Sequence, residues 1–287
     1  MRELLILQHV PSCPAMSRGT LQVKGLAGAT SICCLGQKVV RLGKKTGAND
    51  VVLRVLPNNP ANKSLTDEIS RLHFGISIAP DGLFIEENVN PDGSKPRNHT
   101  LLDGQLIRQR TKLSLDEPSH VTVAGVISLG LTPFTHALPE PMNFDVLGDR
   151  DETCEAAERL GLRSLLIQRK GGQAGVEKYL LIYRWAAVGA ASSAEIGLPG
   201  DVPDRVAMVV RRNGALWLVS DSEPESPICV SLPARSIDGK EIRIPRGGAV
   251  RLDPADEIGC GPVKMTFGPF CQVGDNPTQP NLSAVRA

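Results

Sequence analysis

The sequence repeats one pattern of turns and apolar runs in its two halves. In the first half, Arg41-Leu42-Gly43 is followed downstream by Asp103-Gly104-Gln105-Leu106-Ile107. In the second half, Ala187-Val188-Gly189 and Asp238-Gly239-Lys240-Glu241-Ile242 follow in the same order. An internal repeat of this kind predicts that the chain contains two copies of one structural unit.

Short apolar runs bounded by turn signals fill both halves. Turn sequences such as Pro80-Asp81-Gly82 and Arg212-Asn213-Gly214 separate the runs, and the chain holds 28 Gly and 22 Pro residues. Because helical periodicity is scarce, short strands are favoured over helices. The runs are residues 31–40, 51–55, 73–78, 83–86 and 121–131 in the first half, and 165–169, 179–188, 207–210, 216–219, 241–244 and 263–267 in the second. Together they predict an all-β fold of two antiparallel β-sandwiches.

A proline-rich stretch with one helical pattern separates the two predicted sandwiches. Pro133, Pro139 and Pro141 would interrupt any strand, whereas residues 151–162 show a helical pattern that Gly161 would end. This stretch is therefore predicted to be a linker with one short helix. The predicted division is an N-terminal extension over residues 1–19, a first sandwich over 20–132, the linker over 133–163, a second sandwich over 164–270 and a flexible tail over 271–287.

The charge balance and hydropathy argue against nucleic-acid and membrane partners. The chain has 32 Lys and Arg residues against 31 Asp and Glu, and no run of five or six like charges occurs. A basic field that would attract a polyphosphate backbone is therefore absent from the sequence. Apolar stretches fall short of the ~20 residues that span a bilayer, and the first residues lack the continuous apolar centre of an export signal. We expect a cytoplasmic protein.

Common catalytic and metal-binding motifs are absent from the sequence. It contains no GxSxG elbow, phosphate-binding Walker loop, HExxH pair or Cys/His metal spacing. The seven cysteines form an odd number without a CxxC pair, which argues against a disulfide framework and a zinc site. The sequence predicts no enzyme, cofactor or metal.

Three short motifs in the first half carry groups suited to binding a phosphate. They are Gly43-Lys44, Ser70-Arg71-Leu72-His73 and Asn98-His99-Thr100, the last followed by Asp103-Gly104. A phosphate dianion needs several donors that converge from a rigid frame, and the loops at one end of a sandwich supply such a frame. The hydroxyl and backbone amide of the serine would face the anion, the arginine would add a cation, and the histidine would hold the loop from beneath.

These motifs, in this order and separated by strands, resemble those of the forkhead-associated (FHA) domain over residues 20–131. The resemblance implies a β-sandwich that binds phosphothreonine peptides through the loops at one end. It implies that the phosphopeptide contacts Lys44, Ser70, Arg71, Asn98, Thr100 and Asp103, and that Gly43, His73 and Gly104 support the site.

The first half departs from the family pattern at three positions. Lys44 stands where arginine is usual, so the charge is kept but the bidentate fork is lost. His99 replaces a glycine, and Asp103 replaces an asparagine that could donate as well as accept a hydrogen bond. The alternative interpretation of Asp103-Gly104 is a plain hairpin turn, and Ser70, Arg71 and Lys44 could also be exposed turn residues.

The second half has the same pattern without the proposed ligand contacts. Gly189 is followed by Ala190, and Pro203-Asp204-Arg205-Val206 stands where the first half has Ser70-Arg71-Leu72-His73. We therefore expect a folded FHA-like sandwich that serves packing, spacing or phosphate-independent contacts.

The sequence predicts a non-enzymatic, phosphothreonine-dependent adaptor in Ser/Thr kinase signalling. Its expected partner is a threonine-phosphorylated protein, such as a Ser/Thr kinase or its substrate. The alternative is a phosphate-independent scaffold or structural interaction protein, in which the departures at Lys44, His99 and Asp103 would have no consequence for binding.

Overall fold

The computed structural model describes residues 17–25, 28–57, 59–88, 94–108, 110–135, 151–169, 177–190, 194–223, 225–226, 230–237, 240–254 and 256–269. Most of the predicted N-terminal extension, the middle of the predicted linker and the whole predicted tail lie outside the described residues. Neither helix that is described has the length and apolar character needed to cross a lipid bilayer.

Nearly all regular structure in the described residues is β-strand, which confirms the predicted all-β fold with two sandwiches. The first half contains β1 (Arg18–Gly25), β2 (Gly28–Leu35), β3 (Val39–Gly43), β4 (Val51–Val52), α1 (Pro60–Asp67), β5 (Phe74–Ala79), β6 (Gly82–Glu87), β7 (Thr100–Leu102), β8 (Gln105–Leu106), β9 (Thr111–Lys112), β10 (Ser119–Val123) and β11 (Ile127–Phe134). The second half contains α3 (Glu152–Arg159), β12 (Ser164–Arg169), β13 (Glu177–Ile182), β14 (Trp185–Ala190), β15 (Ile196–Leu198), β16 (Ala207–Arg212), β17 (Ala215–Ser220), β18 (Val230–Ile237), β19 (Lys240–Arg243), β20 (Ala249–Arg251), β21 (Glu257–Cys260) and β22 (Val263–Gly268).

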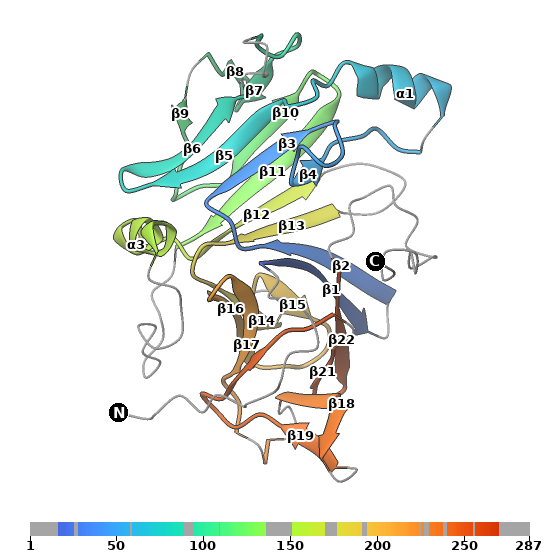
Figure 1. The fold of residues 1–287 in the computed structure, drawn as a ribbon, viewed down its shortest axis with the longest axis vertical. Helices are drawn as coiled ribbons and strands as arrows, with labels where there is room; N and C mark the ends of the chain where they lie inside the picture. The colour runs from blue at the N-terminus through green and yellow to red at the C-terminus, as the bar shows by residue number, and fades with distance from the viewer. Residues whose placement is uncertain are drawn as a thin grey trace.

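One long sheet runs through both sandwiches, and each sandwich is closed by a five-stranded sheet of its own. The order in the long sheet is β19-β18-β21-β22-β1-β2-β13-β12-β11-β10-β7-β8. The sheet β4-β3-β5-β6-β9 covers one end of it and encloses the first core, and the sheet β15-β14-β16-β17-β20 covers the other end and encloses the second core (Figure 1). Most neighbours are antiparallel, but the pairs β3·β4, β14·β15 and β2·β13 run parallel.

The two sandwiches exchange their first hairpins. The hairpin β1–β2 precedes the first sandwich in the chain, yet β1 pairs with β22 of the second sandwich. The hairpin β12–β13 precedes the strands of the second sandwich, yet β12 pairs with β11 of the first. The hairpins meet where β2 and β13 run parallel, with Leu35 opposite Leu181. The repeat along the sequence and the sandwiches in space are therefore composed of different strands.

The shared strands are buried on both faces. Ile32 and Cys34 of β2 point into the second core, whereas Cys33 and Leu35 point into the first. In β13 the residues alternate in the same way between the two cores. Burial on both faces requires a nearly continuous apolar run in place of a polar and apolar alternation, and β2 at residues 32–35 and β13 at residues 179–182 show such a run.

Three predicted strands are in fact pairs of strands. Residues 31–40 divide into β2 and β3, and residues 179–188 divide into β13 and β14, because the chain passes from the long sheet to a small sheet in each run. Residues 121–131 form the hairpin β10–β11, in which Ala124 and Gly125 turn the chain with φ values of 51° and 70°. Apolar character alone predicted these strands, but it does not reveal where a continuous run changes sheets.

The predicted linker helix is present as α3. Its N-cap is Asp151, whose side chain accepts a hydrogen bond of 2.9 Å from the backbone N–H of Cys154. Gly161 follows the helix with a φ of 63°, a conformation that favours glycine and ends the helix as predicted. Ala156 and Ala157 are buried in the first core, and the helix packs against β5.

The helix α1 was not predicted from the sequence. Asn59 caps it by accepting a hydrogen bond of 2.9 Å from Asn62 N–H, and Pro60 occupies the first turn. None of its residues is buried, so the sequence has no apolar stripe to reveal it. The helix projects from the first sandwich between β4 and β5 (Figure 1).

Candidate functional site

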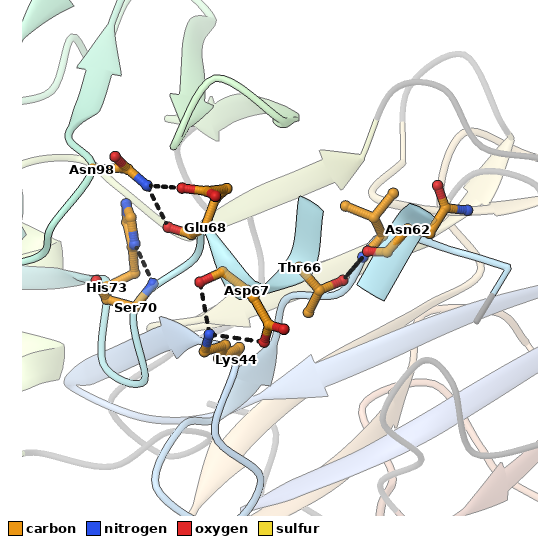
Figure 2. A network of polar contacts seen from close by, with 9 residues as sticks. Lys44, Asn62, Thr66, Asp67, Glu68, Ser70, His73 and Asn98 are labelled. Atoms are coloured by element: carbon orange, nitrogen blue, oxygen red, sulfur yellow. Dashed lines mark hydrogen bonds and ion pairs between the residues drawn. The ribbon is translucent and has the colours of Figure 1, made fainter. Parts of the chain in front are cut away.

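The structure brings the predicted motif loops together at one end of the first sandwich. Lys44 N–H donates to Ser70 O over 3.1 Å, and Lys45 N–H donates to Arg71 O over 3.2 Å. These bonds tie the loop after β3 to the loop before β5. Figure 2 shows Lys44, Ser70, His73 and Asn98 around the C-terminal end of α1.

Gly43 and Asn49 fix the approach of these two loops. A Cβ atom at Gly43 would collide with the carbonyl oxygen of Arg71, so a larger residue would push the loops apart. The buried Asn49 side chain donates from Nδ2 to Lys45 O over 2.9 Å and to Arg71 O over 2.6 Å. Asn49 belongs to the sequence pattern after Gly43, but its role as a loop tie depends on a partner 22 residues away.

His73 holds the Ser70 loop from inside the sandwich. The ring is fully buried, and Nδ1 accepts a hydrogen bond of 3.0 Å from the backbone N–H of Ser70. Burial lowers the pKa of His73 to about 4, against an opposing effect of a backbone hydrogen bond with His99. The ring is therefore neutral at pH 7, with its proton on Nε2. In this structure the Ser70 amide thus donates to His73, and the Ser70 hydroxyl remains the group predicted to face an anion.

Two of the residues predicted to contact the ligand, Lys44 and Asn98, already bind carboxylate groups of the protein. Lys44 Nζ donates to Asp67 O over 2.8 Å and lies 3.2 Å from Asp67 Oδ1. Asn98 Nδ2 donates to Glu68 O over 3.0 Å and to Glu68 Oε2 over 2.6 Å. Both carboxylates come from the end of α1, as Figure 2 shows. Sequence reasoning missed Asp67 and Glu68 because it did not predict this helix.

The other residues predicted to contact the ligand differ in their exposure to solvent. Arg71 is exposed, and within the described part of the chain its guanidinium makes no ion pair. Thr100 is fully buried, and its backbone N–H donates to Glu87 Oε1 over 2.9 Å. The same Glu87 oxygen lies 3.4 Å from His99 Nδ1. Arg71 is thus open to a ligand, whereas Thr100 in this structure lies beneath the surface.

Asp103 and Gly104 form the turn between β7 and β8. Their φ values are 49° and 80°, as in a tight hairpin turn. The Asp103 carboxylate accepts a hydrogen bond of 2.6 Å from His120 N–H on β10. This carboxylate is therefore bound to the neighbouring strand, and no contact in the described residues links it to Lys44, Ser70 or Asn98.

The second sandwich repeats the backbone of this site without its side chains. Ala190 N–H donates to Pro203 O as Lys44 N–H does to Ser70 O, and a Cβ atom at Gly189 would collide with Asp204 O. Val206 takes the place of His73 and donates through its N–H to Val188 O over 2.8 Å. The two halves are therefore equivalent in their loop geometry and differ in their loop chemistry.

An ionic cluster lies near these loops of the second sandwich. The Asp221 carboxylate is 2.5 Å from Arg205 Nη2 and 3.2 Å from Arg246 Nε, and it is almost fully buried. Glu223 Oε1 lies 3.8 Å from Arg246 Nη1, so the two arginines of this cluster face two carboxylates.

Among solved structures, two FHA domains align with part of the chain at low structural similarity. No protein-family model matches the chain, and no curated protein matches it. The FHA domain of CT664 from Chlamydia trachomatis aligns with 23% identity and a TM-score of 0.22, covering 37% of this chain and 89% of that domain. The yeast Dun1 FHA domain, solved with a doubly phosphorylated peptide derived from Rad53, aligns with 15% identity and a TM-score of 0.24, covering 42% of this chain and 78% of that one. Likenesses of this size bear on neither ligand nor partner.

Proposed function

We propose that the first sandwich binds threonine-phosphorylated proteins and that the chain is a non-enzymatic, cytoplasmic adaptor in Ser/Thr kinase signalling. The observation that supports this best is that Lys44, Ser70 and Arg71 lie on two adjoining loops tied by Asn49 and His73, with Asn98 beside them on Glu68. A rigid loop end loses little entropy when it receives an anion, so charge-assisted hydrogen bonds retain most of their strength.

The test is isothermal titration calorimetry with a phosphothreonine peptide and its unphosphorylated twin. We expect the phosphorylated peptide to bind at least about tenfold more tightly, a difference of about 1.4 kcal/mol. The double variant Ser70→Ala, Arg71→Ala should lose this preference with an unchanged melting temperature, because neither side chain supports a core. Arg159→Ala removes an exposed cation from α3 and serves as the control that should bind normally.

Lys44 gives a second, graded test of the same site. Lys44→Ala should weaken phosphopeptide binding by about 1–2 kcal/mol, whereas Lys44→Arg should preserve or improve it by restoring the fork. If both variants bind the phosphopeptide as tightly as the wild type does, Lys44 does not contact the ligand.

The bonds from Lys44 and Asn98 to Asp67 and Glu68 favour one alternative, a phosphate-independent scaffold. Equal affinity for the phosphorylated and unphosphorylated peptides would select that function.

A further inference from the structure

Two carboxylates stand directly beside the donors of the proposed phosphate site. Asp67 Oδ1 is 3.2 Å from Lys44 Nζ, and Glu68 Oε2 is 2.6 Å from Asn98 Nδ2. Asn98 Nδ2 has two protons, and both are used, because Glu68 O takes the second one. A phosphate that reaches these donors must therefore share them with carboxylates or displace them.

The carboxylates are held at this place by the helix that carries them. An isolated helix of eight residues is unstable in water, and α1 buries none of its residues. It is instead fastened by polar contacts: Val55 N–H donates to Thr66 Oγ1 over 2.9 Å, and Asn62 Nδ2 donates to Pro57 O over 2.9 Å. Lys44 and Asn98 fasten its C-terminal end. Asp67 and Glu68 are thus fixed parts of the loop end.

The geometry limits how far a bound phosphate can lie from these charges. A phosphate oxygen that accepts a hydrogen bond from Lys44 Nζ lies no more than about 6 Å from Asp67 Oδ1, because both atoms contact the same ammonium. For a phosphate that shares the Asn98 amide with Glu68 Oε2, the corresponding limit is about 5.5 Å. Like charges at this separation repel, and an added cation would relieve the repulsion.

We propose that Asp67 and Glu68 make the site selective for phosphothreonine flanked by lysine or arginine. This inference rests on the proposed function of the site. The phosphate brings close to two negative charges at pH 7, while Asp67 and Glu68 offset the positive charges of Lys44 and Arg71. Basic side chains next to the phosphothreonine supply the missing positive charge and pair with the exposed Asp67 carboxylate, which is 63% accessible.

The experiment compares three phosphothreonine peptides that differ only in their flanking residues, which are lysine, alanine or glutamate. Each is titrated against the full chain and against the double variant Asp67→Asn, Glu68→Gln. The exposed carboxylates Asp81 and Glu117 lie away from the site loops, so Asp81→Asn, Glu117→Gln is the control with the same change in net charge. An unphosphorylated lysine-flanked peptide measures attraction that does not depend on phosphate.

We expect the full chain to bind the lysine-flanked phosphopeptide about two- to fivefold more tightly than the alanine-flanked one, the range expected for exposed ion pairs. The glutamate-flanked peptide should bind most weakly. The double variant should lose most of this ranking and gain affinity for the alanine-flanked peptide, while the control variant keeps the ranking.

The outcomes separate this inference from the function on which it rests. Phospho-dependent binding with the same ranking in the full chain and the double variant would overturn the inference and leave the function intact. Phospho-dependent binding by the double variant alone would overturn it as well, since the carboxylates would then block the site without selecting a ligand. If neither the full chain nor either variant shows phospho-dependent binding, both this inference and the proposed function are overturned.

Discussion

Gly43 and Gly189 occupy the same position in the two sandwiches, and each permits a close contact between two loops. A Cβ atom would collide with Arg71 O in the first case and with Asp204 O in the second. We expect Gly43→Ala and Gly189→Ala each to lower the free energy of unfolding by about 1–3 kcal/mol, because a packed backbone must move. Urea denaturation measures this loss.

Phosphopeptide binding should separate the two glycine variants. Gly43→Ala displaces the loop that carries Ser70 and Arg71, so it should weaken binding by at least about tenfold. Gly189→Ala alters the equivalent loops of the second sandwich and should leave binding unchanged. A similar effect of both variants on binding would mean that the loss comes from reduced stability alone.

His73 makes the stability of the first sandwich depend on pH. Its pKa is lowered to about 4 from an ordinary value of 6.5, mainly by burial, so the unfolded chain binds the proton more readily than the folded one. The folded state is therefore favoured above pH 6.5, and this advantage is lost as the pH falls toward 4. The expected loss of unfolding free energy between pH 7 and pH 4 is about 3 kcal/mol.

The measurement is urea denaturation at both pH values, with His73→Gln as the variant that lacks the titrating ring. Between pH 7 and pH 4, the free energy of unfolding of the wild type should fall by about 3 kcal/mol more than that of this variant. Titration of the His73 ring by NMR gives the pKa directly. A midpoint near 6.5 would contradict the prediction whatever the variant does.

Among the elements, α3 contacts both sandwiches through its acidic residues. Lys38, which precedes β3, is 2.6 Å from Glu152, and both side chains are largely exposed. Arg211 of β16 is paired with Asp151 and is almost fully buried, and Arg184 lies 3.3 Å from Glu158. The first contact reaches the first sandwich, and the other two reach the second. The helix thus connects the two sandwiches.

The ion pairs of α3 should contribute unequally to stability. Asp151→Ala removes both the N-cap and one partner of the buried Arg211 guanidinium, so we expect a loss of about 1–3 kcal/mol. Glu152→Ala removes an exposed partner of Lys38 and should change stability by about 0.5 kcal/mol or less. Thermal melting of the two variants compares them. Equal effects would show that burial of Arg211 does not strengthen its pair.

Elements with a strong local signal could be predicted from the sequence. The helix α3 has an acidic first turn and Gly161 at its end, and the turns at Pro80-Asp81-Gly82 and Arg212-Asn213-Gly214 are where the residues indicate. The helix α1 lacks an apolar face, so no helical periodicity of apolar residues marks it in the sequence. The ends of β2 and β13 cannot be located from the sequence, because the strand before each break and the strand after it are both apolar and buried.

Only part of the site could be predicted in the same way. The motifs identified Lys44, Ser70 and Asn98 as neighbours, and the structure places them in adjoining loops. The carboxylates of Asp67 and Glu68 bind Lys44 and Asn98, and they come from the end of a helix that the sequence does not reveal. The use of the Ser70 amide by His73 depends on side-chain orientation, which spacing does not specify.

For the whole molecule, the exchange of hairpins predicts that the two halves stay together when the connection between them is cut. A protease site placed between Thr135 and Asp151 interrupts the chain once. The strand pairs β1·β22, β11·β12 and β2·β13 would still hold the halves together. Size-exclusion chromatography after cleavage should show one species of unchanged size, and phosphopeptide binding should persist.

The same cut tests the proposed division into sandwiches over residues 20–132 and 164–270. Two domains that fold independently would separate into species of about half the size. Such separation would show that the pairing between hairpins contributes little to stability. A complex that separates only in urea would measure the strength of that pairing.

The parallel pairing of β2 with β13 joins two halves that have each given a hairpin to the other's sheet. Two subunits of a domain-swapped dimer exchange identical elements in the same way. The second half cannot be discarded, because β12 and β13 complete the sandwich that carries Lys44 and Ser70. Substitutions of apolar residues in the second half should therefore disturb the loops of the first.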